Sequence, residues 1–173
     1  LGVLMQGDVG VGNSASFGVV FEVGAGLGVT TATVGYNGEQ WFRAPDQTPN
    51  DRLDFQYKIL SSYNSATFLI NDETGWTNVN TLDFEALQEG NNSKLNGNVG
   101  ANRSALSDTI SLSATGGDFI AFRWNYDSDS TAAQSGLAVD DLNINFTTVV
   151  VPEPSSALLA LLGATFLLRR SRP

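Results

Sequence analysis

The stretch FIAFRWNY, residues 119–126, decides the fold class of this chain. Its large apolar side chains occupy alternate positions, at Ile120, Phe122, Trp124 and Tyr126. Successive side chains of a β-strand point to opposite faces, so this pattern predicts a strand with one buried face. The other face is formed by the intervening residues, Ala121, Arg123 and Asn125. Trp124 lies in the buried register, and we expect it in the core.

The same alternation recurs along the first 147 residues. It is clear in two further segments, where one face is formed by Phe17, Val19 and Phe21, and by Leu53, Phe55, Tyr57 and Ile59. Turn-forming pairs separate the segments, at Asn37-Gly38, Asn96-Gly97 and Gly116-Gly117. Short alternating strands without helical periodicity predict an all-β fold, an antiparallel jelly roll or β-sandwich over residues 1–147.

The alternation changes phase in the last predicted strand. Leu137 and Val139 fall on odd positions, whereas the following apolar residues fall on even ones, at Leu142, Ile144 and Phe146. A slip of one residue would move half of these side chains out of the core unless an extra residue is accommodated. We therefore predict a β-bulge or a strand break at Asp140-Asp141. From Thr147 to Val151 we expect an extended stalk.

Composition excludes several classes of function. The sequence has no His and no Cys, so it cannot form a Ser-His or Cys-His nucleophile, a His-ligated zinc site or a disulfide. It has 18 acidic and 9 basic residues, a net charge of −9. This excess of negative charge argues against nucleic acid as a partner and is compatible with divalent cations. We predict no enzymatic activity and no cofactor, with structural calcium as the one candidate.

Four acidic residues are the candidates for a calcium site, because calcium prefers several oxygen ligands. Asp127 and Asp129 lie in the polar stretch 125–130, and Asp140 and Asp141 follow the next predicted turn. Pairing of the strands that flank residues 132–136 would bring the four carboxylates together. In the alternative interpretation, Asp140 or Asp141 accepts backbone N–H bonds at the bulge.

Two tryptophans are the candidates for ligand binding. Trp41 follows Asn37-Gly38, and Trp76 follows Thr74-Gly75, so both lie near predicted turns, where an aromatic ring can stack on a sugar. The alternative is that the two rings act as lids over the core. A glycosidase would need a pair of carboxylates, and Asp83 and Glu85 would face the same side of a strand. We treat that pair as the less favoured hypothesis.

The C-terminal segment VPEPSSALLALLGATFLLRRSRP, residues 151–173, combines four parts in order. Pro152, Glu153 and Pro154 lead into two serines, either of which can cap a helix. A helix over residues 157–168 would be about 18 Å long, shorter than the roughly 30 Å hydrocarbon core of a membrane. Its predicted membrane-facing residues are Ala157, Leu158, Leu159, Leu161, Leu162, Phe166, Leu167 and Leu168. The terminal basic residues, expected in the cytoplasm by the positive-inside rule, are Arg169, Arg170 and Arg172.

This order of parts resembles the PEP-CTERM sorting signal, by which Gram-negative bacteria hand exported proteins to the membrane protease-transpeptidase exosortase. The resemblance assigns residues 148–173 to the signal and implies exosortase and, transiently, the inner membrane as partners. The precursor would be anchored with residues 1–147 on the periplasmic side, and the mature protein would reach the cell surface or extracellular matrix. We also expect an export signal upstream, so that the first domain is N-terminally truncated. An ordinary tail anchor and an amphiphilic core helix are the alternatives.

Residues 15–147 also contain strings that resemble exported bacterial jelly-roll domains. These are GYNGEQW (35–41), DRLDFQY (51–57), LNGNVGANRSALS (95–107), FIAFRW (119–124) and GLAVDDLNI (136–144). The resemblance implies a non-catalytic module of unassigned ligand. We therefore expect an exported surface or matrix protein that acts in adhesion or exopolysaccharide binding. A structural coat or spacer protein and a glycosidase-like enzyme are the alternatives.

Overall fold

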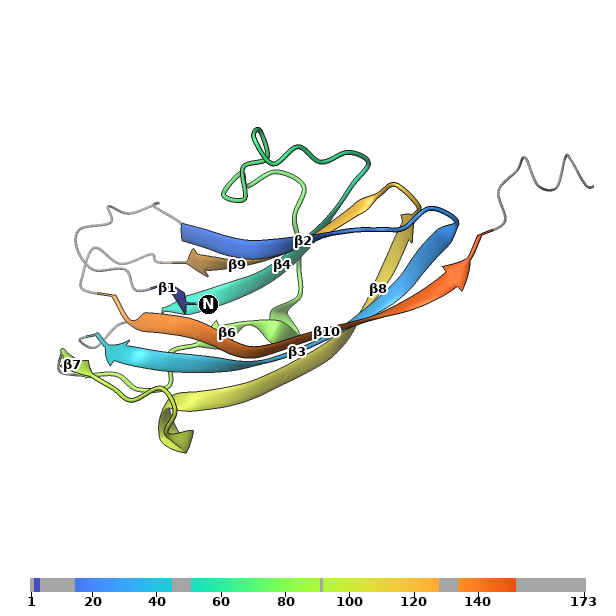
Figure 1. Ribbon diagram of the computed structural model, residues 1–173. Coiled ribbons are helices and arrows are strands. Elements are labelled where there is room, and N and C mark those ends of the chain that lie inside the picture. The colour runs from blue at the N-terminus through green and yellow to red at the C-terminus, as the bar shows by residue number, and fades with distance from the viewer. Residues whose placement is uncertain (1, 4–14, 45–50, 91, 128–133, 152–173) are drawn as a thin grey trace, which may run out of the picture.

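The computed structural model describes residues 2–3, 15–44, 51–90, 92–127 and 134–151 (Figure 1). The Pro-Glu-Pro motif, the apolar stretch and the terminal arginines lie outside these residues, and so does the predicted C-terminal helix. Within the described part of the chain, no helix has the length and apolar character needed to cross a membrane.

Two antiparallel sheets form the fold. In the first sheet, β1 (Gly2–Val3), β10 (Gly136–Val150), β3 (Leu27–Arg43) and β7 (Ser93–Lys94) lie in that order, and β8 (Arg103–Thr115) also pairs with β3. In the second sheet the order is β2 (Ala15–Glu22), β9 (Phe119–Asp127), β4 (Arg52–Leu60) and β5 (Thr77–Asn78), and β6 (Phe84–Glu85) also pairs with β4. Two short 3-10 turns, η1 (Asn80–Leu82) and η2 (Gly100–Asn102), are the helical elements of the described residues. The prediction of an all-β, antiparallel fold is confirmed.

The core lies between the two sheets and is largely aromatic. Tyr36 of β3 meets Trp124 of β9 edge to face, with ring centroids 5.4 Å apart. Phe55 of β4 lies 5.2 Å from Trp124 and 5.8 Å from Phe122. Such pairs contribute about 0.5–1.5 kcal/mol beyond the burial of their area. The predicted buried register is confirmed, because Ile120, Phe122, Trp124 and Tyr126 are all at most 1% exposed.

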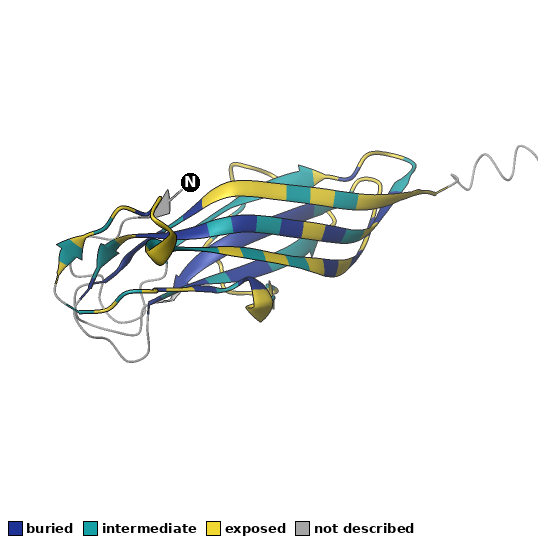
Figure 2. Cartoon of the chain, turned by 90° about the horizontal axis from the view of Figure 1, so that it is seen from below, coloured by how far each residue is buried: buried dark blue, intermediate teal, exposed yellow. Residues whose placement is uncertain are grey.

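The outer face of the first sheet follows the expected alternation, with exposed and buried residues in turn along β8 and much of β3 (Figure 2). The outer face of β9 in the second sheet does not. Ala121, Arg123 and Asn125 are buried there, so the expectation of one buried side is wrong for this strand. The segment 61–79, which joins β4 to η1 and contains β5, is green in Figure 1 and covers part of this face.

Arg123 holds this segment on the sheet. Its guanidinium donates hydrogen bonds to the carbonyl oxygens of Ile70, at 2.7 Å, and Asp72, at 3.1 Å. It forms an ion pair with Glu73 at 2.9 Å, and it lies 4.3 Å from the ring centroid of Trp76. A charge removed from water is costly unless it is paired and hydrogen-bonded, and these contacts meet that requirement.

The predicted β-bulge is confirmed. The pairing of β10 with β3 shifts register between Asp140 and Asn143, and Asp141 has a φ of 52°, in the left-handed region. The extra residue absorbs the change of phase. Apolar side chains on both sides of the bulge therefore reach the core, namely Leu137, Val139, Ile144 and Phe146.

Strand β10 continues past the predicted end of the domain. Residues 148–150 pair with residues 27–29 of β3, and the Val151 N–H donates to the carbonyl oxygen of Gly26 at 2.8 Å. The segment is extended, as predicted, but it belongs to the sheet because β3 supplies its hydrogen-bond partners. Residues 148–151 are therefore continuous with the first sheet, although we expected the domain to end at residue 147.

One predicted turn is part of a strand. Asn37-Gly38 lies inside β3, whereas Gly116-Gly117 joins β8 to β9 as predicted, with a φ of 93° at Gly117. Gly38 serves a different purpose, because a Cβ at this position would lie 2.3 Å from ring atoms of Phe84. The missing side chain lets Phe84 pack directly on the strand.

We predict that Arg123→Met lowers the free energy of unfolding by about 2 kcal/mol, because backbone carbonyl oxygens of the covering segment lose a charged donor. Denaturant titration measures the change, and limited proteolysis should cleave residues 61–79 faster in the variant. Arg103→Met is the matched control. Arg103 pairs with the exposed Asp141 at 3.2 Å, and its loss should cost less than about 1 kcal/mol. Equal losses in the two variants would contradict the role of Arg123.

Candidate functional site

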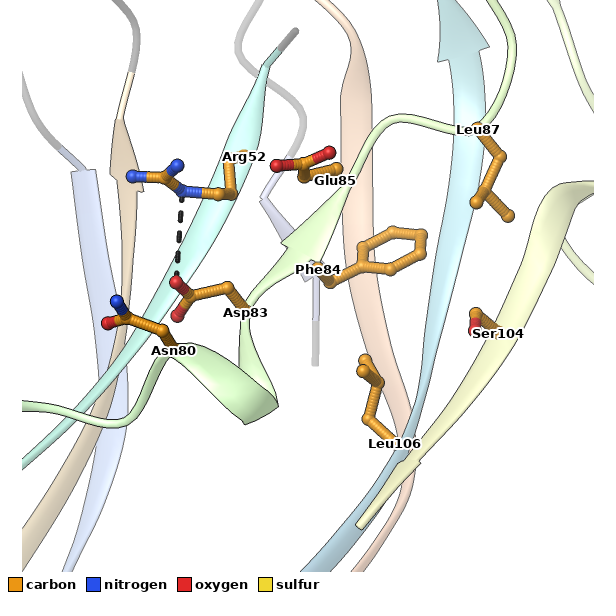
Figure 3. A pocket seen from close by; sticks show the side chains of 8 residues that line it. All are labelled: Arg52, Asn80, Asp83, Phe84, Glu85, Leu87, Ser104 and Leu106. Carbon is orange, nitrogen blue, oxygen red and sulfur yellow. Dashed lines mark ion pairs between the residues drawn. The ribbon is translucent and has the colours of Figure 1, made fainter. Parts of the chain in front are cut away.

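A pocket of about 350 Å³ opens between the segment around β6 and strand β8 (Figure 3). The polar side chains of Arg52, Asp83 and Glu85 gather on one side of it, and Phe84 and Leu106 form the apolar side. Strand β4 supplies Arg52, and β8 supplies Leu106. The complete lining is Arg52, Asn80, Asp83, Phe84, Glu85, Leu87, Ser104 and Leu106.

The wall around β6 is fixed to both sheets. Leu82 and Phe84 are buried in the core. The Tyr36 hydroxyl of β3 donates to the carbonyl oxygen of Leu82, and burial raises the pKa of this tyrosine above its usual range. On the other side, Asp83 Oδ1 accepts the backbone N–H of Phe55 in β4 at 2.9 Å. The wall is therefore held in place without any ligand.

Negative charge exceeds positive charge on the polar side. Arg52 Nε pairs with Asp54 and lies 3.9 Å from Asp83 Oδ2. The Asp83 side chain is only 12% exposed. Burial raises the pKa of its carboxyl above the usual range against the opposing hydrogen bond from Phe55; Asp54 and Glu85 add to the rise, and Arg52 opposes it. The pocket thus offers one guanidinium and several carboxylate oxygens beside an apolar surface.

The predicted carboxylate pair, Asp83 and Glu85, lies in this pocket. Only Glu85 is in the short strand β6, and Asp83 precedes it at the end of η1. Glu85 is exposed, whereas one oxygen of Asp83 is committed to the Phe55 N–H. The two acids therefore line the same pocket, and Asp83 also accepts a hydrogen bond from the β4 backbone.

Trp41 lies on the opposite side of the first sheet from the core. Its side chain is 38% exposed, and its indole N–H donates to Glu39 Oε2 at 3.0 Å. Gly97 lies beneath the ring, because a Cβ there would be 2.5 Å from Trp41 Nε1. Trp41 therefore remains a candidate sugar contact, with one side supported by the chain.

Trp76 has a different environment. Its ring stacks on Arg123, lies 6.3 Å from the Phe68 ring and has Lys58 Nζ 5.9 Å from its centroid. Its indole N–H donates to the carbonyl oxygen of Asp72 at 2.7 Å. These contacts make Trp76 a cover for the Arg123 guanidinium on the outer face of the second sheet, away from the core between the sheets. Trp41 belongs to the first sheet and Trp76 covers the second, so the two rings do not form a common platform.

The four predicted calcium ligands are not seen as one group. Asp127 ends β9, Asp129 lies outside the described residues, and Asp140 is exposed. Asp141 Oδ2 accepts hydrogen bonds from Asn37 Nδ2, at 2.7 Å, and from Arg103 Nη2, at 3.2 Å. Both of these partners are side chains, from β3 and β8. In the part of the chain that the structure describes, no group of three or more acidic, His or Cys side chains is arranged to hold a metal.

Arg52, Asn80, Ser104 and Leu106 were not predicted as site residues. They come from β4, η1 and β8, which are far apart in the sequence, so no local pattern connects them. An arginine between two acids, in the stretch DRLD (51–54), was the available signal. Comparison of the chain with protein-family models and with curated proteins gives no match.

The raised pKa of Asp83 has a consequence for stability. Between the ordinary pKa of an aspartic acid, near 4, and the raised value, the folded protein binds more protons than the unfolded chain. Stability therefore falls as the pH rises through this window. We predict that Asp83→Asn, which keeps an oxygen to accept the Phe55 N–H, removes this fall. Denaturant titrations from about pH 3 to pH 7 measure the slope.

Asp108→Asn is the control with the opposite sign. Hydrogen bonds from Thr81 and from the Thr109 backbone lower the pKa of Asp108. Its contribution to stability is present above the ordinary pKa and is lost as the pH falls through the lowered value, so the substitution removes that acid-side loss. If the stability of Asp83→Asn depends on pH in the same way as that of the wild type, the raised pKa of Asp83 is not the cause of the fall.

Proposed function

We propose that this chain is an exported, exosortase-sorted surface or matrix protein whose jelly-roll-type body binds an exopolysaccharide without catalysis. The observation that carries the proposal is the pocket of Figure 3, which combines carboxylates and a guanidinium with an apolar wall. Sugars present hydroxyl groups and apolar C–H faces together, and ligand pockets with a few convergent polar groups have this composition. The preformed wall lowers the cost of ordering the site on binding.

The negative charge of the pocket limits which class of sugar can bind. Arg52 is already paired with Asp54, and Asp83 and Glu85 leave an excess of negative charge. A uronic acid would be repelled by these carboxylates, whereas neutral hydroxyl groups can donate hydrogen bonds to them. Neutral or amino sugars are therefore the proposed ligands. The exposed Trp41, on the first sheet, is a separate proposed contact for a long polysaccharide.

A glycosidase-like enzyme is the second candidate, favoured by one observation. A carboxyl with a raised pKa next to a second carboxylate is the arrangement of a general acid and its partner. Against it, Asp83 is tied to the β4 backbone and lies near Arg52, which fits a structural role. A coat or spacer protein, the third candidate, would leave the pocket without a ligand.

The binding prediction uses isothermal titration calorimetry with neutral and amino-sugar oligosaccharides chosen by glycan array. Glu85→Gln removes an exposed charge and should weaken binding about tenfold, the equivalent of 1.4 kcal/mol. Ser104→Trp should fill the pocket from β8 and abolish binding. Asp140→Asn, the control, removes one exposed acid outside the pocket and should leave affinity unchanged. No binding to any glycan would favour the spacer, and turnover lost in Glu85→Gln would favour the enzyme.

The sorting prediction concerns the C-terminal segment. Its support is the order of the Pro-Glu-Pro motif, the apolar stretch and the arginines directly after the end of β10. Mass spectrometry of protein from exosortase-positive cells should find a C-terminus near Pro154 and no peptide from residues 157–168. Protein from cells without exosortase should retain these peptides. An intact tail in mature protein from both strains would contradict sorting by exosortase.

A further inference from the structure

A glutamine side chain is completely buried at the end of the sandwich where β3 ends and β10 begins, on the left in Figure 1. Gln40 follows Tyr36 and Gly38 at alternate positions of β3, so its side chain points to the core side of the first sheet. Its Oε1 accepts the backbone N–H groups of Leu87, at 2.9 Å, and Gln88, at 2.7 Å. Its Nε2 donates to the carbonyl oxygen of Gln88 at 2.8 Å. The orientation of the carboxamide is therefore fixed, because a flipped group would set its N–H groups against two donors.

A buried serine hydroxyl lies next to this carboxamide. Gln40 Nε2 also donates to Ser135 Oγ, at 3.4 Å, and Ser135 directly precedes β10. The backbone of this serine is held on both sides, because its N–H donates to Asp51 Oδ2 at 2.5 Å and its carbonyl oxygen accepts the Tyr126 hydroxyl at 3.0 Å. Burial raises the pKa of Tyr126, so its hydroxyl remains a donor. The Ser135 hydroxyl is the acceptor in its contact with Gln40, so its own proton is available to a base.

These groups match the parts of an acyl-transfer site. Two backbone N–H groups on one carbonyl oxygen stabilise the negative charge that develops there when a nucleophile adds to the carbon. The carbon of the Gln40 carboxamide is one bond from Nε2, so the Ser135 hydroxyl lies next to the group that it would attack. Asp51 is also buried and is bound to the N–H of the same serine, which places a carboxylate close to the hydroxyl. Since both reacting groups are buried, the hydroxyl, not bulk water, is the nucleophile at hand.

Hydrogen bonding alone does not account for the position of the serine. Gln40 Nε2 carries two hydrogens and has three acceptors, namely the carbonyl oxygens of Gln88 and Phe42, the latter at 3.3 Å, and Ser135 Oγ. The contact with Ser135 is the longest of the three and exceeds the usual range for an N–H···O bond, about 2.7–3.2 Å. The serine and the carboxamide therefore lie as a nucleophile and a carbonyl group do before reaction, when the reacting atoms are about 3–3.5 Å apart.

We propose that Ser135 and Gln40 form an ester cross-link between the start of β10 and the end of β3. Ser135 Oγ adds to Gln40 Cδ, and the bond between Cδ and Nε2 breaks. Asp51 takes the hydroxyl proton and passes it to the departing nitrogen, which leaves as ammonia. The amide and the hydroxyl thus become an ester and one ammonia, and no other reactant is consumed. In a chain without cysteine, this bond links two strands covalently across 95 positions of the sequence and so constrains the unfolded chain, as a disulfide does.

Mass spectrometry of the folded full chain tests the proposal. The ester should lower the intact mass by that of one ammonia. Trypsin cuts after Arg43 and Arg123, so Gln40 and Ser135 lie in different peptides, and the two peptides should be recovered as one linked species. A folded chain of unchanged mass would overturn the proposal. So would glutamate at position 40 or a loss of ammonia at any asparagine, if no linked peptides accompany it.

Two variants test the nucleophile and the base separately, with linked peptides followed over time in freshly synthesised protein. Ser135→Ala removes the hydroxyl but keeps the backbone groups that Asp51 and Tyr126 bind, so the chain should fold without the link. Asp51→Asn keeps an oxygen for the Ser135 N–H and removes the base, so it should slow link formation about 100-fold or more. The exposed Ser111→Ala is the matched control and should link at the wild-type rate. A link that persists in Ser135→Ala, or that forms equally fast in Asp51→Asn, would contradict these roles. The linked peptides of the wild type decide the main question even if a variant fails to fold.

Discussion

The burial of strand β9 on both faces is the constraint on which the rest of the structure depends. On the inner face, Trp124 packs against Tyr36 and Phe55 and joins the two sheets. On the outer face, the Arg123 guanidinium is hydrogen-bonded to Gln56 of the neighbouring strand and to the backbone of residues 70–72. A side chain that is hydrogen-bonded both to the sheet and to a loop can hold the loop in place without β-strand pairing. Residues 80–87, which follow this loop and line the pocket, therefore start from a position that Arg123 holds.

The pocket depends on that position and on close packing between the sheets. Phe84 contacts β3 because Gly38 lacks a side chain, and Asp83 reaches back to the Phe55 backbone. Each contact places one residue of the wall and leaves Glu85 exposed to solvent. The same packing partly removes Asp83 from water, which raises its pKa. The shape of the site and its electrostatics thus have one cause, the position of the β6 segment, which pairs with β4 and packs Phe84 against β3.

The bulge in β10 separates two parts of the strand that differ in register with β3 and in the charge of their residues. Asp141 takes a left-handed conformation there and is held by Asn37 and Arg103. The register shift keeps apolar residues in the core on both sides. It also ends the part of the edge that β1 covers, and the uncharged sequence begins directly after it. One local irregularity therefore separates the part of the strand that pairs with β1 from an uncharged stretch.

The sequence by itself determined the all-β class, the buried register of residues 120–126 and the bulge at Asp140-Asp141, because period-two alternation reports directly on which side of a strand faces the core. The tertiary structure decided what alternation cannot express. Arg123 has the pattern of a solvent-facing residue, and only the fold brings residues 61–79 over it. Asn37-Gly38 has the composition of a turn, and only the approach of Phe84 shows why a strand contains it. The pocket joins β4, η1 and β8, and contacts between segments so far apart in sequence are set by packing, not by any local pattern.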